Sequence, residues 1–133
     1  MRLFDTNILI DVFLDDSVWS AWSKGTIESA LGRDRLINIV IYAELAAGFA
    51  QSKALDAELT KLGMIIADIP PAAAFRAGRA HAAYRRAGGS RARVLPDFLV
   101  GAQAAALKVP LVTRDPRRYR TYLPDLVLIA PAP

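Results

Sequence analysis

Four carboxylates stand at the borders of apolar segments, which is a costly setting for a charged side chain. Asp5 and Asp115 each follow a short apolar run, Asp97 opens another, and Glu44 interrupts a longer one. Burying an unpaired charge costs several kcal/mol, so something must compensate it. A shared divalent cation is the simplest compensation. Such a metal lowers the pKa of a bound water, positions it for attack at phosphorus and neutralises charge on the leaving oxygen.

The rest of the composition restricts which metal the chain can hold. Cysteine is absent and His81 is the only histidine, so the sequence offers no disulfide, no thiolate site and no histidine-rich zinc site. Any metal must therefore bind to oxygen ligands. Carboxylates and water are the ligands that Mg²⁺ or Mn²⁺ prefers, so we expect one of these ions as the cofactor.

The formal net charge of +4 is unevenly distributed. Residues 1–75 carry six basic and ten acidic side chains, whereas residues 76–133 carry eleven basic and three acidic ones. A basic surface around a small acidic site suits a polyanion, although a merely solvated face is an equal alternative. The candidate phosphate contacts flank the loop at Gly88 and Gly89 or follow the fourth apolar run: Arg85, Arg86, Arg91, Arg93, Arg114, Arg117, Arg118 and Arg120.

Short apolar runs alternate with helical patterns along the chain. We expect strands at 3–4, 35–39, 64–67, 111–113 and 126–129, and helices up to about 31, up to about 62, at 72–87 and at 97–107. Strands separated by helices indicate βαβ units, so the predicted fold is an α/β protein, a three-layer α/β/α sandwich with a mainly parallel sheet. The 133 residues fit one domain, 1–133. No leader and no membrane-length apolar run is apparent, so a cytoplasmic protein without membrane contact is expected.

This fold gives the four carboxylates a place to meet. Ligands in open parallel sheets bind beyond the carboxyl ends of the strands, where the strand order switches. Asp5 and Asp115 follow predicted strand ends, while Glu44 and Asp97 lie near the starts of helices that can face the same edge. We therefore expect the four side chains to converge.

Four ordered segments around these acids resemble the PIN-domain ribonucleases, and in particular the VapC toxins of type II toxin-antitoxin pairs. They are Arg2-Leu3-Phe4-Asp5-Thr6-Asn7, Tyr42-Ala43-Glu44-Leu45, Pro96-Asp97-Phe98-Leu99 and Leu111-Val112-Thr113-Arg114-Asp115. The resemblance implies a Mg²⁺- or Mn²⁺-dependent endoribonuclease with Asp5, Glu44, Asp97 and Asp115 as catalytic metal ligands, supported by hydrogen bonds from Asn7 and Thr113. It also implies an RNA substrate, a cognate antitoxin as partner, and a homodimer.

Other interpretations of the same residues stay open. Thr6 or Asn7 can simply cap a helix, and Asp97 can favour the positive end of its helix. A phosphorelay receiver domain is also an α/β sandwich with acids at strand ends, and Asp68 follows the predicted third strand as its phospho-acceptor would. A non-catalytic module that binds nucleic acid or a partner protein, and a DNA nuclease with the same metal chemistry, are further alternatives.

Overall fold

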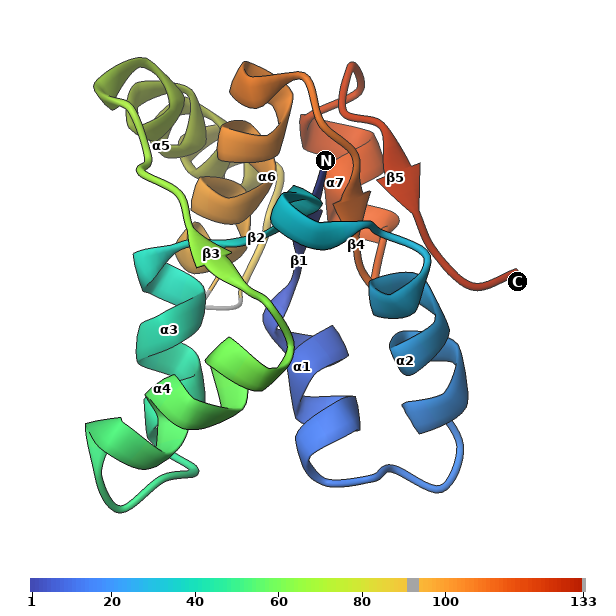
Figure 1. Ribbon diagram of the computed structural model, residues 1–133. Coiled ribbons are helices and arrows are strands. Elements are labelled where there is room, and N and C mark those ends of the chain that lie inside the picture. The colour runs from blue at the N-terminus through green and yellow to red at the C-terminus, as the bar shows by residue number, and fades with distance from the viewer. Residues whose placement is uncertain (91–93, 133) are drawn as a thin grey trace.

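The computed structural model describes residues 1–90 and 94–132 and contains one five-stranded sheet (Figure 1). All paired strands run parallel, in the order β3-β2-β1-β4-β5. The strands are β1 (Arg2–Phe4), β2 (Arg35–Ile37), β3 (Ile65–Ile66), β4 (Leu111–Val112) and β5 (Leu128–Ile129). The predicted parallel α/β/α sandwich is confirmed.

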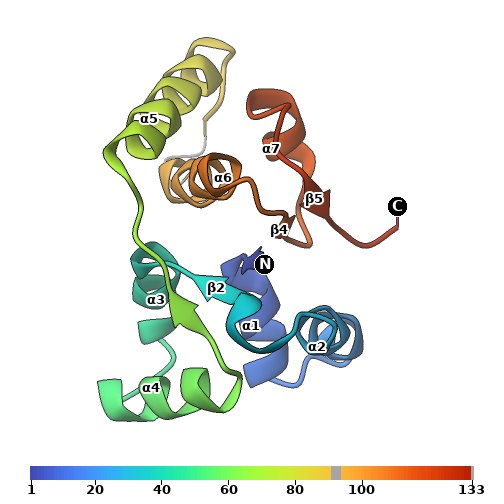
Figure 2. The ribbon, with the colours of Figure 1, turned by 45° about the horizontal axis from the view of Figure 1, so that its top comes forward.

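Helices cover both faces of this sheet (Figure 2). The helices are α1 (Thr6–Phe13), α2 (Ser20–Glu28), α3 (Ile39–Ala46), α4 (Ser52–Lys61), α5 (Pro71–Arg86), α6 (Leu95–Leu107) and α7 (Arg117–Tyr122). Helices α1, α2 and α4 lie on one side, and α5, α6 and α7 lie on the other. Helix α3 lies at the edge and contacts both α1 and α6. Among the described residues, no helix combines the length and apolar character needed to cross a bilayer.

The strand order places a switch point at the centre of the sheet. The chain moves outward from β1 through β2 to β3, then crosses back over the other face to β4 on the opposite side of β1. The connections leaving β1 and β4 therefore diverge and leave room between them at the carboxyl ends of the strands. This is the edge at which Asp5 and Asp115 follow their strands.

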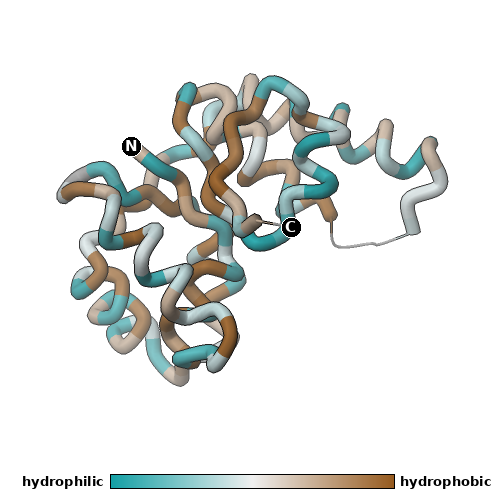
Figure 3. The backbone as a smooth tube through the Cα atoms, turned by 90° about the vertical axis from the view of Figure 1, so that its right-hand side faces the viewer, coloured by the Kyte–Doolittle hydropathy of each residue, from teal (hydrophilic) through white to brown (hydrophobic). Residues whose placement is uncertain are grey.

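The apolar side chains of the central strands β1 and β4 are completely buried. Leu3, Phe4, Leu111 and Val112 are fully buried. In Figure 3, hydrophobic stretches run through the middle of the molecule and hydrophilic ones recur along the outer helices. Complete burial on both faces explains why these strands appear in the sequence as continuous apolar runs rather than alternating patterns.

A buried polar link fixes α3 and α6 to one another. Asn38 caps α3 by accepting a hydrogen bond from the backbone N–H of Ile41 at 2.9 Å, and its amide donates to Gln103 Oε1 on α6 at 2.7 Å. Gln103 in turn donates to the carbonyls of Ala67 and Asp68, beyond β3. Both amide side chains are fully buried, so the link is costly to disturb. It fixes the helix of Glu44 relative to that of Asp97.

Several element boundaries differ from the sequence-based prediction. The first strand is one residue longer than predicted and the other four are shorter, and the two long helical stretches each divide into two helices. Helix α7 was not predicted, because an arginine-rich segment shows little apolar periodicity. Asp5, not Thr6 or Asn7, is the N-cap of α1, so the predicted cap was one or two residues too late. Its carboxylate accepts from the backbone N–H of Thr6 at 2.8 Å.

Candidate acidic active site

All four predicted carboxylates line one pocket of about 230 Å³ at the switch point of the sheet. Asp5 and Asp115 come from the ends of β1 and β4, Glu44 from α3, and Asp97 from the first turn of α6. The complete lining is Asp5, Thr6, Asn7, Ile10, Glu44, Asp97, Asp115, Arg118 and Tyr119. Residues separated by more than a hundred positions thus share one hollow.

Asp5 is the buried centre of this pocket. Its side chain is 6% exposed. One oxygen accepts the N–H of Thr6, and the other, Oδ2, accepts from the hydroxyls of Thr113 at 2.8 Å and Tyr119 at 3.0 Å. Three donors, from the loop after β4, from α7 and from its own helix, therefore fix the orientation of one carboxylate.

The pKa of Asp5 is raised to about 6. Burial is the largest cause, and the negative charge of Asp97 adds to it, while the hydrogen bonds from Thr113, Thr6 and Tyr119 act in the opposite direction. The charged form is thus disfavoured even with three donors in place. A cation bound next to Asp5 relieves this penalty.

Tyr119 is a site residue that sequence reasoning missed. Burial and the charge of Asp5 raise the pKa of Tyr119 well above its ordinary value, so the hydroxyl keeps its proton and donates it. The ring fits because α6 has a glycine beneath it: a Cβ on Gly101 would lie 2.8 Å from Tyr119 and 2.7 Å from Leu123. The sequence signal that could have indicated this contact is Gly101, a glycine in the apolar helix that precedes the arginine-rich segment.

Asp97 and Arg118 form an ion pair at the pocket. Arg118 Nη2 donates to Asp97 Oδ2 at 2.7 Å, and the two side chains are 25% and 28% exposed. Burial acts to lower the pKa of Arg118, but the hydrogen bond and charge of Asp97 outweigh it and raise the pKa. A cation already stands beside one of the four acids.

Glu44 and Asp115 differ from Asp5 because both are exposed. The apolar run that Glu44 interrupts does not shield it, since Ala43, Ala46 and Ala47 on the same helix are exposed as well. Glu44 Oε1 accepts from the hydroxyl of Thr6 at 2.9 Å. Of the four acids, only Asp5 is buried, whereas the apolar segments around them suggested burial of all four.

Asn7 and Thr113 connect the pocket to its supporting loop. The amide of Asn7 donates to Thr113 Oγ1 at 3.3 Å, and its carbonyl oxygen accepts from the backbone N–H of Arg114 at 3.3 Å. Thr113 Oγ1 also accepts from the backbone N–H of Asp115 at 3.1 Å while donating to Asp5. These bonds tie the start of α1 to the loop that carries Asp115.

The candidate arginines occupy several different places. Arg85 and Arg86 lie in the last turn of α5 and Arg117 begins α7, and all three are exposed. Arg91 and Arg93 lie outside the described residues. Arg114 points away from the acid pocket and binds Asp11, which leaves Arg118 as the one that lines the pocket in the described part of the chain.

Asp11 anchors Arg114 through a buried bidentate pair. Arg114 donates to Asp11 at 2.7 and 2.9 Å, and the hydroxyl of Ser23 donates to the same carboxylate at 2.7 Å. Asp11 is 1% exposed, and the guanidinium stacks over the ring of Trp19 at 5.3 Å. This cluster links α1 and α2 to the loop after β4.

The ligand set fits a hard divalent cation, although it is not assembled as a finished site. Within residues 1–90 and 94–132, no three His, Cys, Asp or Glu side chains already form a group that could hold a metal ion. Glu44 bonds to Thr6 and Asp97 to Arg118, so the acids are directed to protein partners. The donors are nevertheless carboxylate oxygens, as Mg²⁺ and Mn²⁺ require, and the raised pKa of Asp5 marks an uncompensated charge.

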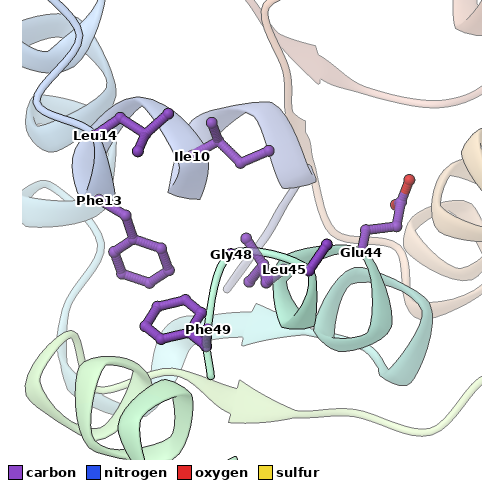
Figure 4. Close-up of a pocket in the computed structure, with 8 residues that line it drawn as sticks. Ile10, Phe13, Leu14, Glu44, Leu45, Gly48 and Phe49 are labelled. Atoms are coloured by element: carbon purple, nitrogen blue, oxygen red, sulfur yellow. The ribbon is translucent and has the colours of Figure 1, made fainter. Parts of the chain in front are cut away.

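An apolar groove of about 470 Å³ adjoins the acid pocket (Figure 4). Ile10 and Glu44 line both hollows, and the groove continues along α1 and the end of α3 to Leu14 and Phe49. Phe13 and Phe49 meet edge to face at its floor, with ring centroids 5.6 Å apart. Leu14 is 75% exposed and Ile10 is 39% exposed, so the groove presents apolar side chains to solvent.

Asp68, the phospho-acceptor required by the receiver alternative, lies elsewhere. It follows β3, which is an edge strand, and it does not line the acid pocket. Its backbone carbonyl accepts from Gln103, so its position serves the link between α6 and the sheet. The arrangement of the described residues gives no support to a phosphorelay site.

Comparison with known proteins agrees with the fold. Residues 2–123 match the profile of the PIN domain. Among solved structures, the chain is similar to VapBC2 from Rickettsia felis bound to a promoter DNA fragment (19% identity, 98% of each chain, TM-score 0.71). It is also similar to VapBC-1 from nontypeable Haemophilus influenzae (21% identity, 97% of this chain and 96% of that one, TM-score 0.71) and to a toxin-antitoxin complex from Klebsiella pneumoniae (24% identity, 96% of each chain, TM-score 0.64).

No curated protein sequence matches the chain significantly. The family assignment therefore depends on the domain profile, which covers nearly the whole chain and includes all four carboxylates. The solved structures, which are 17–24% identical, add agreement in fold. From the profile match over residues 2–123, the chain belongs to the PIN-domain family.

Proposed function

We propose that this protein is a metal-dependent endoribonuclease and the VapC toxin of a VapBC pair. The family and the similarity to chains from VapBC complexes support a toxin nuclease. The acidic pocket supports hydrolysis of phosphodiester bonds. Asp5, Glu44, Asp97 and Asp115 are the proposed ligands of Mg²⁺ or Mn²⁺.

The single observation that carries this proposal is the state of Asp5. A carboxylate with three hydrogen-bond donors still has its pKa raised to about 6, because it is buried beside Asp97. Both carboxylate oxygens accept hydrogen bonds here, and a neutral amide, which has one acceptor oxygen and an NH₂ donor, could not satisfy the same three donors. A buried carboxylate that is fixed in orientation and whose charged form is disfavoured is suited to bind a cation.

The residues have distinct roles in this proposal. When bound, a divalent cation activates a water and neutralises charge on the phosphate. Asp5 provides a fixed ligand, because Thr113 and Tyr119 hold its orientation. Glu44 and Asp115 are exposed and can turn toward the cation as substrate approaches. The open pocket admits a polymer rather than enclosing a small molecule.

An RNA substrate fits the charge around the pocket. Arg85, Arg86 and Arg117 are exposed on α5 and α7, and Arg118 lines the pocket. Cations around an acidic centre attract the phosphate backbone while the metal neutralises the centre itself. Single-stranded loops, which present accessible phosphates, are the expected targets.

The apolar groove supports a protein partner at the same site. Its exposed Leu14 and Ile10 suit an apolar segment of an antitoxin, and Glu44 at the shared rim suits a basic side chain that enters the acid pocket. A bound antitoxin would thereby exclude both metal and RNA. A homodimer remains a prediction, which sedimentation of the purified protein tests.

RNA cleavage by the antitoxin-free protein tests the proposal. We expect cutting of a structured RNA pool with Mg²⁺ or Mn²⁺, no cutting with a chelator, and loss in Asp5→Asn and Asp97→Asn. Asp125→Asn is a matched control, since this acid lies in an exposed pair with Arg76 and outside the pocket. Uniform cutting by all variants would indicate a contaminating ribonuclease, and no cutting by a folded wild type would contradict the proposal.

A further inference from the structure

We propose that Arg118 has two successive partners: it neutralises Asp97 in the metal-free pocket, and it contacts the scissile phosphate once a metal ion takes Asp97. This inference depends on the proposed nuclease function and assigns a catalytic role to one arginine within it. The juxtaposition that carries it is a guanidinium inside a hollow lined by four carboxylates.

The guanidinium of Arg118 has a buried hydrogen-bond donor without an acceptor. Nη2 donates to Asp97 Oδ2 at 2.7 Å, whereas the buried Nε has no hydrogen-bond partner in the described structure. An arginine presents five N–H donors in a planar fork, and an unmade bond at a buried nitrogen costs free energy. A phosphate oxygen at the pocket would supply the missing acceptor, and the fork matches phosphate geometry.

Asp97 is the point at which metal and arginine compete. It is one of the four oxygen ligands available to a hard cation, and it is the one engaged by a guanidinium. A divalent ion would concentrate more charge at shorter distance than a guanidinium can, so Asp97 would serve as its ligand and the ion pair with Arg118 would weaken. The released guanidinium stays in the pocket because its helix is fixed.

The backbone around Arg118 is anchored on both sides. The next residue, Tyr119, is 3% exposed and donates to Asp5, and Leu123 at the end of α7 is 1% exposed. Both side chains press against Gly101 of α6. Helix α7 therefore keeps its place, and exchange of partners requires rotation of the Arg118 side chain alone.

The other described arginines do not share this setting. Arg114 donates two hydrogen bonds to the buried Asp11 and stacks on Trp19, so a change of partner would break all of these contacts. Arg85, Arg86 and Arg117 are exposed and lie outside the pocket lining. Arg118 is thus the described arginine that combines a pocket position, an acid partner and an unused donor.

Two measurements on Arg118→Gln test the proposal, because they are expected to move in opposite directions. The affinity for Mn²⁺, measured by electron paramagnetic resonance of free ion, should become about two- to fivefold tighter when the competing guanidinium is removed. The single-turnover rate of RNA cleavage at saturating Mn²⁺ should fall about 10²-fold, as expected for loss of one preorganised phosphate contact.

Control variants separate this role from a structural one. Arg76→Gln removes an arginine from an exposed pair with Asp125 and should leave both readouts unchanged. Arg118→Lys keeps the charge without the fork and should restore metal affinity to the wild-type value and cleavage only in part.

Each alternative outcome has a definite meaning. Weaker or unchanged Mn²⁺ binding in a folded Arg118→Gln protein contradicts the competition for Asp97. Tighter binding with an undiminished cleavage rate contradicts the phosphate contact and leaves Arg118 as a counter-ion only. Failure of the wild-type protein to cut any RNA would instead overturn the proposed function, and the Mn²⁺ titration would still decide whether Arg118 competes.

Discussion

Two arginines that follow the fourth strand, Arg114 and Arg118, each bind an aspartate, and the two pairs differ in how far the aspartate is buried. Arg114 binds Asp11 through two hydrogen bonds, and that acid is 1% exposed and also bonded to Ser23. Arg118 donates from Nη2 to Asp97 at 2.7 Å, and both side chains are about a quarter exposed. The first pair encloses its acid, whereas the acid of the second pair is partly exposed.

The difference separates an ion pair that holds the fold from one that serves a site. Asp11 is fully enclosed, so any exchange of partner by Arg114 leaves a buried charge behind. The pair of Arg118 and Asp97, with both side chains about a quarter exposed and three further acids nearby, can exchange partners at small cost. The same residue types, a few positions apart, therefore support α1 and α2 in one case and line the acid pocket in the other.

The largest expected effect distinguishes the two acids by activity. Asp97→Asn should lower metal-dependent RNA cleavage by at least about 10²-fold, since loss of a ligand exceeds loss of an outer-shell contact. Asp11→Asn keeps a hydrogen-bonding side chain outside the pocket and should leave cleavage within about threefold of wild type after correction for the folded fraction. Initial rates on one RNA substrate check both. Equal losses would show that the pairs do not differ in function.

Stability should show the reverse order. Arg114→Leu leaves the carboxylate of Asp11 buried with only Ser23 as a described partner, and should lower the free energy of unfolding by about 3–5 kcal/mol. Arg118→Leu, at a partly exposed pair, should change it by less than about 1 kcal/mol. Urea unfolding followed by tryptophan fluorescence measures both values. A larger cost at Arg118 would contradict this comparison.

Asp5 extends the comparison to an acid with no salt bridge among the described residues. Because its pKa is raised to about 6, the folded state retains a proton that the unfolded state releases near pH 4. Stability should therefore fall as the pH rises from about 4 to about 6, by on the order of 3 kcal/mol. Asp5→Asn should remove this portion of the pH dependence. Urea midpoints of both proteins across pH 4–7.5, without metal, measure it, and identical profiles would refute the assignment.

The smallest expected effect concerns the hydroxyl that orients Asp5. Tyr119→Phe keeps the ring against Gly101 but removes the donor at 3.0 Å. We expect about tenfold weaker Mn²⁺ binding, typical of an outer-shell contact, and a loss of about 1 kcal/mol in stability. Tyr122→Phe, on the same helix but outside the pocket lining, is the matched control. Unchanged metal affinity in Tyr119→Phe would restrict Tyr119 to packing.

The sequence predicted the fold and the four acids because both follow from local patterns. Apolar runs alternating with helices specify a parallel sheet, and an acid that closely follows a strand, as Asp5 and Asp115 do, falls at the carboxyl edge. Glu44 and Asp97, near the starts of helices, were expected to face the same edge, and all four acids line one pocket. The family was predicted correctly from the resemblance to PIN domains, and the profile match confirms it.

The contacts around those acids were not predictable from local patterns. Tyr119, Arg118 and Asp11 meet their partners across 21 to 114 positions, and nothing in the neighbouring sequence marks the pairing. Asp11 is fully enclosed, which its place in the sequence does not indicate. Helix α7 was missed because its stability comes from Tyr119 and Leu123 packing on α6, which is a tertiary effect.

The central claim is that the acid pocket binds a divalent cation, and Mn²⁺ titration of the purified wild-type and Asp97→Asn proteins tests it most directly. Electron paramagnetic resonance reports the free ion and needs no substrate. The account predicts saturable binding by the wild type at pH 7.5 and at least about tenfold weaker binding by the variant. Equal affinities, or no saturable binding by a folded wild type, would contradict the account.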